Sequence, residues 1–234
     1  MRFTALASGS NGNSILVETE DARLLIDAGL SGKRLQARAE SRGLSLERLD
    51  AVLVTHNHSD HVGGAGVIHR RFGPRLFMTR GTYRACHGRM GKLLDFHRFT
   101  AGETLRFGGT TVTSIPTPHD GVEGVAYVIE SAGRRLGVLT DLGHPFPALE
   151  DVLPSLDAAF LEANYDPEML ENGPYPYDLQ RRISGKGGHL SNGECAALAA
   201  GAAGERLRLL ILSHLSGENK RPEVAREAAA GLPV

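Results

Sequence analysis

The pattern of apolar and polar positions changes along the chain and divides it into three stretches. Up to about residue 92, short apolar runs of strand length alternate with segments of helical periodicity. Residues 103–141 carry consecutive β-type runs instead, and the last third returns to alternation. Because strands that alternate with helices are typical of α/β proteins, the pattern predicts an α/β fold with a β meander near its middle.

The predicted strands are short and end at polar or turn-forming residues. They are expected at residues 3–7, 14–18, 24–29, 51–54, 75–78, 110–115, 125–130, 135–140, 158–161 and 207–212. Helices are expected at about 31–42, from after residue 64 to about 72, at 81–92 and at 191–203. Ser31 is the expected N-cap of the first helix. Helix breakers are spread along the chain and no linker separates its parts, which favours a single domain over residues 1–234.

Composition excludes several functions. The formal charge is -1 at pH 7, so no global field draws the protein to nucleic acid or to an anionic membrane. No window approaches the roughly 20 consecutive apolar residues of a membrane span. The two cysteines, Cys86 and Cys195, lie far apart, and the N-terminus does not resemble a secretory signal. We therefore expect a cytoplasmic protein with no membrane partner and no thiol nucleophile.

One stretch departs from this charge balance. Between residues 69 and 98 there are one acid, Asp95, one lysine, Lys92, and seven arginines: Arg70, Arg71, Arg75, Arg80, Arg84, Arg89 and Arg98. A smaller basic group consists of Arg181, Arg182 and Lys186. Such a stretch is either a solvated face or a surface that follows a phosphate backbone. The second interpretation depends on an active site that handles phosphate.

The most informative feature is a cluster of metal-binding residue types directly after the apolar strand at 51–54. Three histidines and an aspartate lie within six residues: His56, His58, Asp60 and His61. Imidazole nitrogens and carboxylates suit zinc and similar divalent ions. Four ligands on one strand-to-helix turn do not all reach a single ion comfortably. The cluster therefore predicts a site for two metal ions.

Three further polar side chains follow apolar strands in the same way: His119, Asp141 and His214. Strand ends converge on one rim of a sheet, where sites usually form. The order His-x-His-x-Asp-His, then a distant His, Asp and His, resembles the metallo-β-lactamase superfamily of dinuclear hydrolases over nearly the whole chain. This resemblance implies a four-layer αββα sandwich with the metals at one edge. It assigns His56, His58 and His119 to one ion, Asp60, His61 and His214 to the other, and Asp141 to both.

The expected cofactors are two divalent ions, zinc or manganese, because the ligand set has no thiolate. Two cations that share a bound water lower its pKa toward 7, which makes hydroxide the nucleophile at neutral pH. The superfamily hosts thioesterases, lactonases, β-lactamases and nucleases, so the motif by itself does not fix the substrate.

Two further residues, Glu162 and His189, resemble elements of tRNase Z-type phosphodiesterases. In those enzymes the glutamate orients a histidine that donates a proton to the leaving alkoxide. A phosphodiester needs such help because a sugar oxyanion leaves poorly. With Asp60, these two are the predicted catalytic residues. The other interpretation makes Glu162 part of a structural ion pair and His189 a residue at a helix N-terminus.

Several local strings together resemble the bacterial WalJ/YycJ subgroup of the superfamily, at residues 6–14, 26–32, 188–192 and 212–216. This resemblance implies a cytoplasmic exonuclease that degrades duplex DNA from 5′ ends. The chain also lacks the inserted arm of tRNase Z enzymes and the cap domain of β-CASP ribonucleases. DNA is therefore the expected substrate and partner.

Two alternatives remain open from the residues alone. A hydrolase of small phosphodiesters, esters or thioesters needs the metals but no extended basic surface, and a metal-stabilised binding protein needs no turnover. The segment at 167–187 is rich in tyrosine, proline and arginine, and three aromatic side chains there or beside it either stack on bases or pack internally: Tyr165, Tyr175 and Tyr177.

Overall fold

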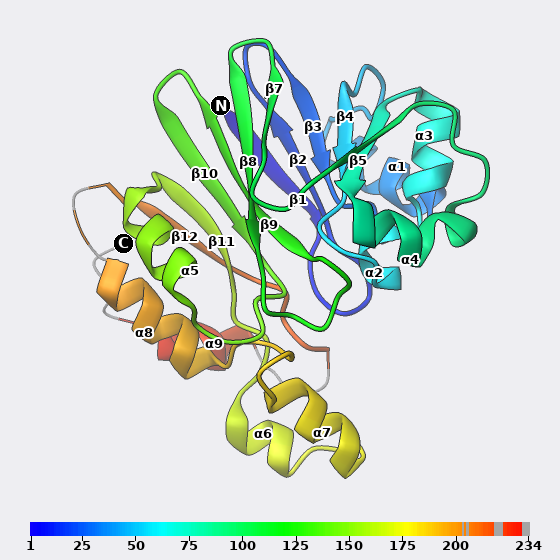
Figure 1. Ribbon diagram of the computed structural model, residues 1–234. Coiled ribbons are helices and arrows are strands. Elements are labelled where there is room, and N and C mark those ends of the chain that lie inside the picture. The colour runs from blue at the N-terminus through cyan, green and yellow to red at the C-terminus, as the bar shows by residue number, and fades with distance from the viewer. Residues whose placement is uncertain (203, 205, 218–221, 231–234) are drawn as a thin grey trace. The chain divides into compact units, whose positions relative to one another are not determined.

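The computed structural model describes residues 1–202, 204, 206–217 and 222–230. The chain divides into two compact units (Figure 1), one made of residues 1–116 and 121–125 and the other of residues 117–120 and 126–234. Within the described residues, no helix is long and apolar enough to cross a membrane.

The sheet of the first unit has six strands in chain order: β1 (Arg2–Ala7), β2 (Ser14–Glu18), β3 (Arg23–Ile26), β4 (Ala51–Leu53), β5 (Arg75–Thr79) and β6 (Phe96–Phe99). The first three strands pair antiparallel, whereas β3 to β6 run parallel. Ile26 of β3 lies opposite Leu53 of β4. The segments that follow these two strands therefore leave the sheet at the same edge.

Four helices belong to this unit: α1 (Gly32–Glu40), α2 (Ser59–Val62), α3 (Ala65–Phe72) and α4 (Arg80–Met90). Figure 1 shows α1, α3 and α4 together beside the sheet. Their apolar sides share one core with the strands, in which Leu25 and Val52 join Leu35 and Ile68. Ser31 is the N-cap of α1, as expected, and its hydroxyl accepts a hydrogen bond from the Arg34 amide. The unit also contains an antiparallel hairpin of β7 (Thr104–Phe107) and β8 (Thr110–Pro116).

The second unit contains four further strands: β9 (Val125–Ser131), β10 (Arg134–Leu139), β11 (Ala158–Glu162) and β12 (Leu209–Ser213). β9 and β10 are antiparallel, as the predicted meander requires, while β10, β11 and β12 are parallel. Leu139, Leu161 and Leu212 lie side by side in register. The carboxyl ends of three strands therefore meet at one edge.

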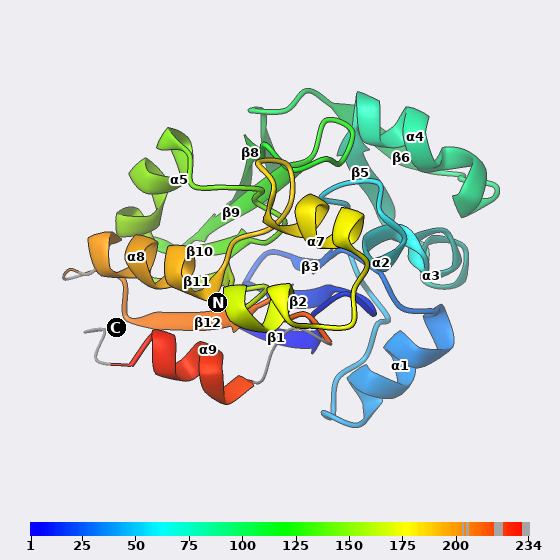
Figure 2. The same cartoon turned by 90° about the horizontal axis from the view of Figure 1, so that it is seen from below.

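The helices of the second unit fall into two groups. The first group comprises α5 (Pro147–Val152), the short 3-10 helix η1 (Leu153–Ser155), α8 (Asn192–Ala202) and α9 (Pro222–Ala228). The second is a pair, α6 (Pro167–Glu171) and α7 (Tyr177–Ser184), which lie side by side in Figures 1 and 2. The sequence pattern does not predict this pair, because its helices are short and flanked by prolines. Asp166 nevertheless caps α6 by accepting a hydrogen bond from the Met169 amide at 3.0 Å.

The close approach of α3 to α4 gives a stability prediction. A Cβ added at Gly66 in α3 would lie 1.9 Å from the Met90 carbonyl oxygen, so the two helices must separate to admit it. We expect Gly66→Ala to lower the free energy of unfolding by about 1–3 kcal/mol, as overpacking does. Gly88 in α4 is the matched control, because a Cβ there meets nothing within 4 Å. Gly88→Ala should raise stability by about 0.5–1 kcal/mol. Urea unfolding measures the free energy of unfolding of both variants. Equal changes in the two variants would contradict the close contact between α3 and α4.

Candidate metal and catalytic centre

In the first unit, the predicted metal motif begins in the turn after β4 and continues into α2. His56 and His61 are buried, while His58 and Asp60 are partly exposed. Nε2 of His56 and Nδ1 of His58 face each other at 2.9 Å. Nε2 of His61 lies 3.3 Å from an Asp60 carboxylate oxygen. The four residues thus present nitrogen and oxygen atoms in two adjacent pairs, an arrangement that suits cation binding.

A buried carboxylate orients the His61 ring. Asp27 follows β3 and lies beside the end of β4, where Nδ1 of His61 donates a hydrogen bond to its Oδ2 at 2.7 Å. The Thr55 amide and hydroxyl also donate to Asp27, each at 2.8 Å. Burial raises the pKa of the Asp27 carboxyl, and attraction to His61 opposes that effect. Metal-binding histidines commonly tie their second ring nitrogen in this way, which directs the other nitrogen to the ion.

The glycine-rich loop between β1 and β2 also touches the motif. Nδ2 of Asn13 donates to Asp60 at 3.2 Å and lies 2.9 Å from Nε2 of His61. Gly29 is required nearby, because a Cβ there would lie 1.6 Å from the Asp60 carbonyl oxygen. Neither Asp27 nor Asn13 is predicted as a site residue from the sequence. The only signal for them is the glycine-containing string around each, which lets backbone approach the motif.

In the second unit, four predicted site residues converge where the parallel strands end. Ligand-type atoms of Asp141, Glu162, His189 and His214 all lie within 4.8 Å of one another. Nε2 of His214 is 3.5 Å from Oδ1 of Asp141, and Nε2 of His119 is 3.7 Å from the same oxygen. Nδ1 of His119 donates to the Gly188 carbonyl at 2.7 Å. As with His61, this hydrogen bond directs the other ring nitrogen toward a carboxylate.

Glu162 is the completely buried centre of this group. Its Oε1 accepts from Nδ1 of His189 at 2.7 Å and from Nδ1 of His214 at 3.1 Å. Its Oε2 accepts from the Leu142 amide at 2.8 Å and the Leu190 amide at 3.3 Å. Both carboxylate oxygens of Glu162 are therefore engaged by donors, two of which are imidazole rings. Burial alone would raise its pKa, but the attraction of His189 and the imidazole hydrogen bonds outweigh it and lower the pKa.

The segment that carries His189 is fixed by backbone contacts within the unit. The Asp120 amide donates to the Gly187 carbonyl at 2.9 Å, and Nδ1 of His144 donates to the Lys186 carbonyl at 2.7 Å. Nε of Arg182 in α7 also lies 2.7 Å from the Asp120 carboxylate. These contacts place the His119 loop, the Asp141 loop and the start of the His189 segment together.

Three site residues have a left-handed backbone. Asp27, Asp141 and His214 have φ values of 60°, 56° and 54°. This region disfavours residues with a Cβ and costs on the order of 1–3 kcal/mol at each position. Aspartate and histidine are among the residues that occupy it most often.

The basic stretch of the first unit reaches the metal motif. Arg89 in α4 donates to the Asn57 carbonyl at 2.7 Å, between two of the motif histidines. The Asn57 side chain in turn accepts from the Val122 amide at 2.7 Å. Arg98 is held over the Tyr83 ring at 5.1 Å. At least one arginine of the stretch, Arg89, therefore lies beside the predicted ligands.

Comparisons with known proteins agree with this description. The family model described as the metallo-beta-lactamase superfamily matches residues 7–169. The chain is 34% identical over 228 residues to an exodeoxyribonuclease YycJ of Bacillus anthracis, with 97% of this chain and 86% of the relative covered. It is 36% identical over 228 residues to an exodeoxyribonuclease WalJ of Streptococcus pneumoniae, with 96% and 85% covered.

Solved structures show the same fold at low identity. The metallo-beta-lactamase fold protein YhfI of Bacillus subtilis gives a TM-score of 0.75 at 19% identity, with 98% of this chain and 92% of that one covered. The short form of human tRNase Z gives a TM-score of 0.64 at 16% identity, with 92% and 93% covered. The predicted α/β class and fold are confirmed.

The hydrogen bond between Asp27 and His61 gives a test of metal binding. Asp27→Ala removes the acceptor that holds the ring, so we expect the affinity for zinc to fall by about 10- to 100-fold. Asp95→Ala is the control in the same unit, because the half-exposed Asp95 side chain pairs with Arg75 at 2.7 Å and not with a predicted ligand. Competition with a chromophoric chelator measures both affinities. If the Asp27 variant bound zinc as tightly as the wild type, Asp27 would not be needed to orient the His61 ring for metal binding.

Proposed function

Because the chain belongs to the metallo-beta-lactamase superfamily, whose members here include relatives named exodeoxyribonucleases, we propose that it is a metal-dependent DNA exonuclease. The proposed reaction is hydrolysis of phosphodiester bonds in duplex DNA, from the 5′ ends. The pairing of His189 with the buried Glu162 carboxylate is the observation that carries this proposal.

The ligand chemistry of both units fits divalent cations. We assign His56, His58 and His119 to one ion, Asp60, His61 and His214 to the other, and Asp141 to both, with zinc or manganese as the ions. The support is the buried imidazole and carboxylate clusters of each unit and the protein acceptors on the second nitrogens of His61, His119 and His214. When bound, such ions supply the Lewis acidity that makes water a nucleophile at neutral pH.

His189 is the proposed proton donor. Its Nδ1 proton is held by a carboxylate whose lowered pKa keeps it ionised at neutral pH. Because Nδ1 is engaged by Glu162, Nε2 is the ring atom left to donate a proton to a substrate. The His189 side chain is 19% exposed, so a bound substrate can contact it. Donation from Nε2 to the leaving sugar oxygen neutralises the charge that makes this group leave poorly.

DNA as the substrate has independent support in the charges around the two clusters. Arg89 contacts the metal-motif turn in the first unit, and Arg182 contacts the loop after His119 in the second. Cations beside a phosphodiester site bind the neighbouring phosphates of the same strand. A hydrolase of small esters would gain little from them.

The proton-donor assignment predicts an effect that depends on the leaving group. His189→Ala should reduce the turnover of DNA by about 10²-fold or more, the scale of general acid catalysis, and leave the metal content near that of wild type. The same variant should turn over bis-p-nitrophenyl phosphate with a much smaller reduction in rate, because the p-nitrophenolate leaving group departs without a proton. His87→Ala is the control, because His87 is an exposed histidine on α4 that bonds the Tyr83 carbonyl.

End-labelled duplex and single-stranded DNA, incubated with zinc- or manganese-loaded protein, provide the measurement. Stepwise loss from 5′ ends, absent in an Asp60→Ala variant with reduced metal content, is the expected result. Cleavage of the small phosphodiester alone would replace the nuclease proposal by a small-molecule phosphodiesterase. Full DNA turnover by the His189 variant would remove the proton-donor role.

A further inference from the structure

The helix pair α6 and α7 is attached to the catalytic group of the second unit. Arg182 of α7 pairs with Asp120, the residue after His119. The His189 amide donates to the Ile183 carbonyl at 2.9 Å, so the last turn of α7 adjoins the proposed proton donor. A small apolar core holds the pair together, formed by Tyr165, Leu170, Ile183, Tyr175 and Leu179.

A cavity of about 260 Å³ opens between the two helices. Tyr165 and Leu170 supply apolar lining, and Tyr177 also lines it. The polar lining includes Glu171, Gln180 and Arg181. Tyr165 is 7% exposed, and burial raises the pKa of its phenol to about 12, so it remains neutral. The internal-packing interpretation therefore holds for Tyr165 and Tyr175, which belong to the core of the pair.

Tyr177 has a different environment. It is 70% exposed and is the only aromatic residue among the strongly exposed large hydrophobic side chains of the described chain. The guanidinium carbon of Arg181, one turn further along α7, lies 5.8 Å from its ring centroid. Nucleobases stack on exposed aromatic rings, and a neighbouring arginine adds a cation–π contact. Tyr177 and Arg181 supply both beside an open cavity.

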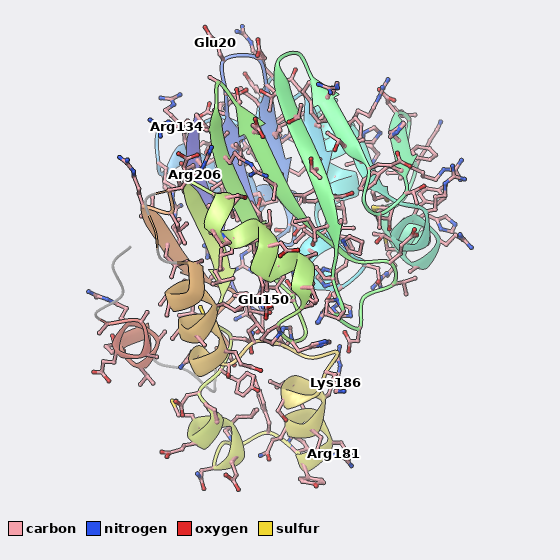
Figure 3. All side chains as sticks on the ribbon, turned by 60° about the vertical axis from the view of Figure 1, so that its left-hand side comes forward. Glu20, Arg134, Glu150, Arg181, Lys186 and Arg206 are labelled. Carbon is pink, nitrogen blue, oxygen red and sulfur yellow. The ribbon has the colours of Figure 1, made fainter. Side chains whose placement is uncertain are left out.

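Positive charge continues from this ring toward His189. Arg181 and Lys186 are exposed, and Figure 3 shows both on the α7 side of the unit, away from Arg134 and Arg206. Tyr177 and Ile183 are six residues apart, which is about 9 Å along a helix axis. That length corresponds to about three nucleotide steps of B-form DNA. A strand with its reacting phosphate at His189 therefore has a nearby base within reach of Tyr177.

We infer that the cavity between α6 and α7 binds a nucleobase of the DNA strand near the cleaved bond, stacked on Tyr177, with Arg181 neutralising an adjoining phosphate. This inference rests on the proposed nuclease function and adds to it a binding subsite. Stacking tolerates any base, because every base presents a π face, so the subsite secures the strand without selecting sequence.

The experiment uses the metal-loaded full chain and phosphorothioate-linked DNA that resists hydrolysis. Single 2-aminopurine bases are placed at each of the first four positions from the 5′ end, since stacking quenches their fluorescence. Binding of the wild-type protein should quench the fluorescence of 2-aminopurine at one of these positions. Tyr177→Ala should abolish that quench and weaken DNA binding by roughly 5- to 100-fold, the range for one base stacked on an aromatic ring. Tyr177→Phe should restore both, because it keeps the ring.

Two controls separate the subsite from general effects. The plot of log affinity against log salt concentration has a negative slope. Arg181→Gln should reduce the magnitude of that slope by nearly one unit, because one phosphate contact is lost. Arg134→Ala removes an exposed arginine that pairs with Asp157 at 2.9 Å and should leave that slope unchanged. Turnover of bis-p-nitrophenyl phosphate should be the same in all four variants, since none alters the catalytic group.

The outcomes distinguish this inference from the function on which it rests. If wild type cleaves DNA but Tyr177→Ala retains the quench and the affinity, the subsite is wrong and the nuclease stands. If wild type neither binds nor cleaves DNA, both are wrong. Loss of the quench in Tyr177→Ala, recovery in Tyr177→Phe and unchanged turnover of the small substrate would establish the stacking site.

Discussion

Four N–H groups converge on the buried carboxylate of Glu162, and the geometry of the cluster that it forms with Asp141, His189 and His214 depends on this interaction. Two donors come from the backbone and tie the segments around Leu142 and Leu190 to the end of β11. The other two come from His189 and His214. An ionised carboxylate is stable in such a place only when its oxygens are fully engaged, so loss of one donor would weaken the positions of the rest.

The first unit also contains a buried carboxylate that is stabilised by hydrogen-bond donors, formed by different residues. Asp27 is a second buried carboxylate at the end of a parallel strand, and it also accepts from one imidazole and from a backbone amide. In both units the reason lies in strand direction. Parallel neighbours deliver their following residues to one edge, where a short acidic side chain reaches the adjacent loop and fixes a histidine ring. The left-handed backbone at Asp27 and Asp141 is part of the same construction.

Much of this arrangement could be predicted from the chain itself. Apolar runs that end in histidine or aspartate predicted β4, β10 and β12 and the site residues after them. Burial leaves little choice of side chain in β4 and most of β10, whereas β12 is apolar although it is only partly buried. The pattern did not predict β6, where exposed His97 and Arg98 interrupt the apolar run at the edge of the sheet. It also did not predict α6 and α7, because prolines usually indicate the end of a helix. Here Pro167 is the first residue of α6, and Pro176 directly precedes α7.

The orienting residues were hidden for a different reason. Asp27 and Asn13 act through contacts with residues 34 and 48 positions away, and no local spacing records such a contact. The single domain expected from the sequence remains a prediction beside the two compact units described here.

The ring nitrogens of His61, His119 and His214 are each held by a protein acceptor. The rotational freedom of these side chains is consequently lost when the chain folds, and not when a cation arrives. Zinc fingers differ, because their fold forms only with the metal. Here the strands rest on buried apolar side chains, so these rings are in place before any cation binds, and their orientation does not depend on which cation is present.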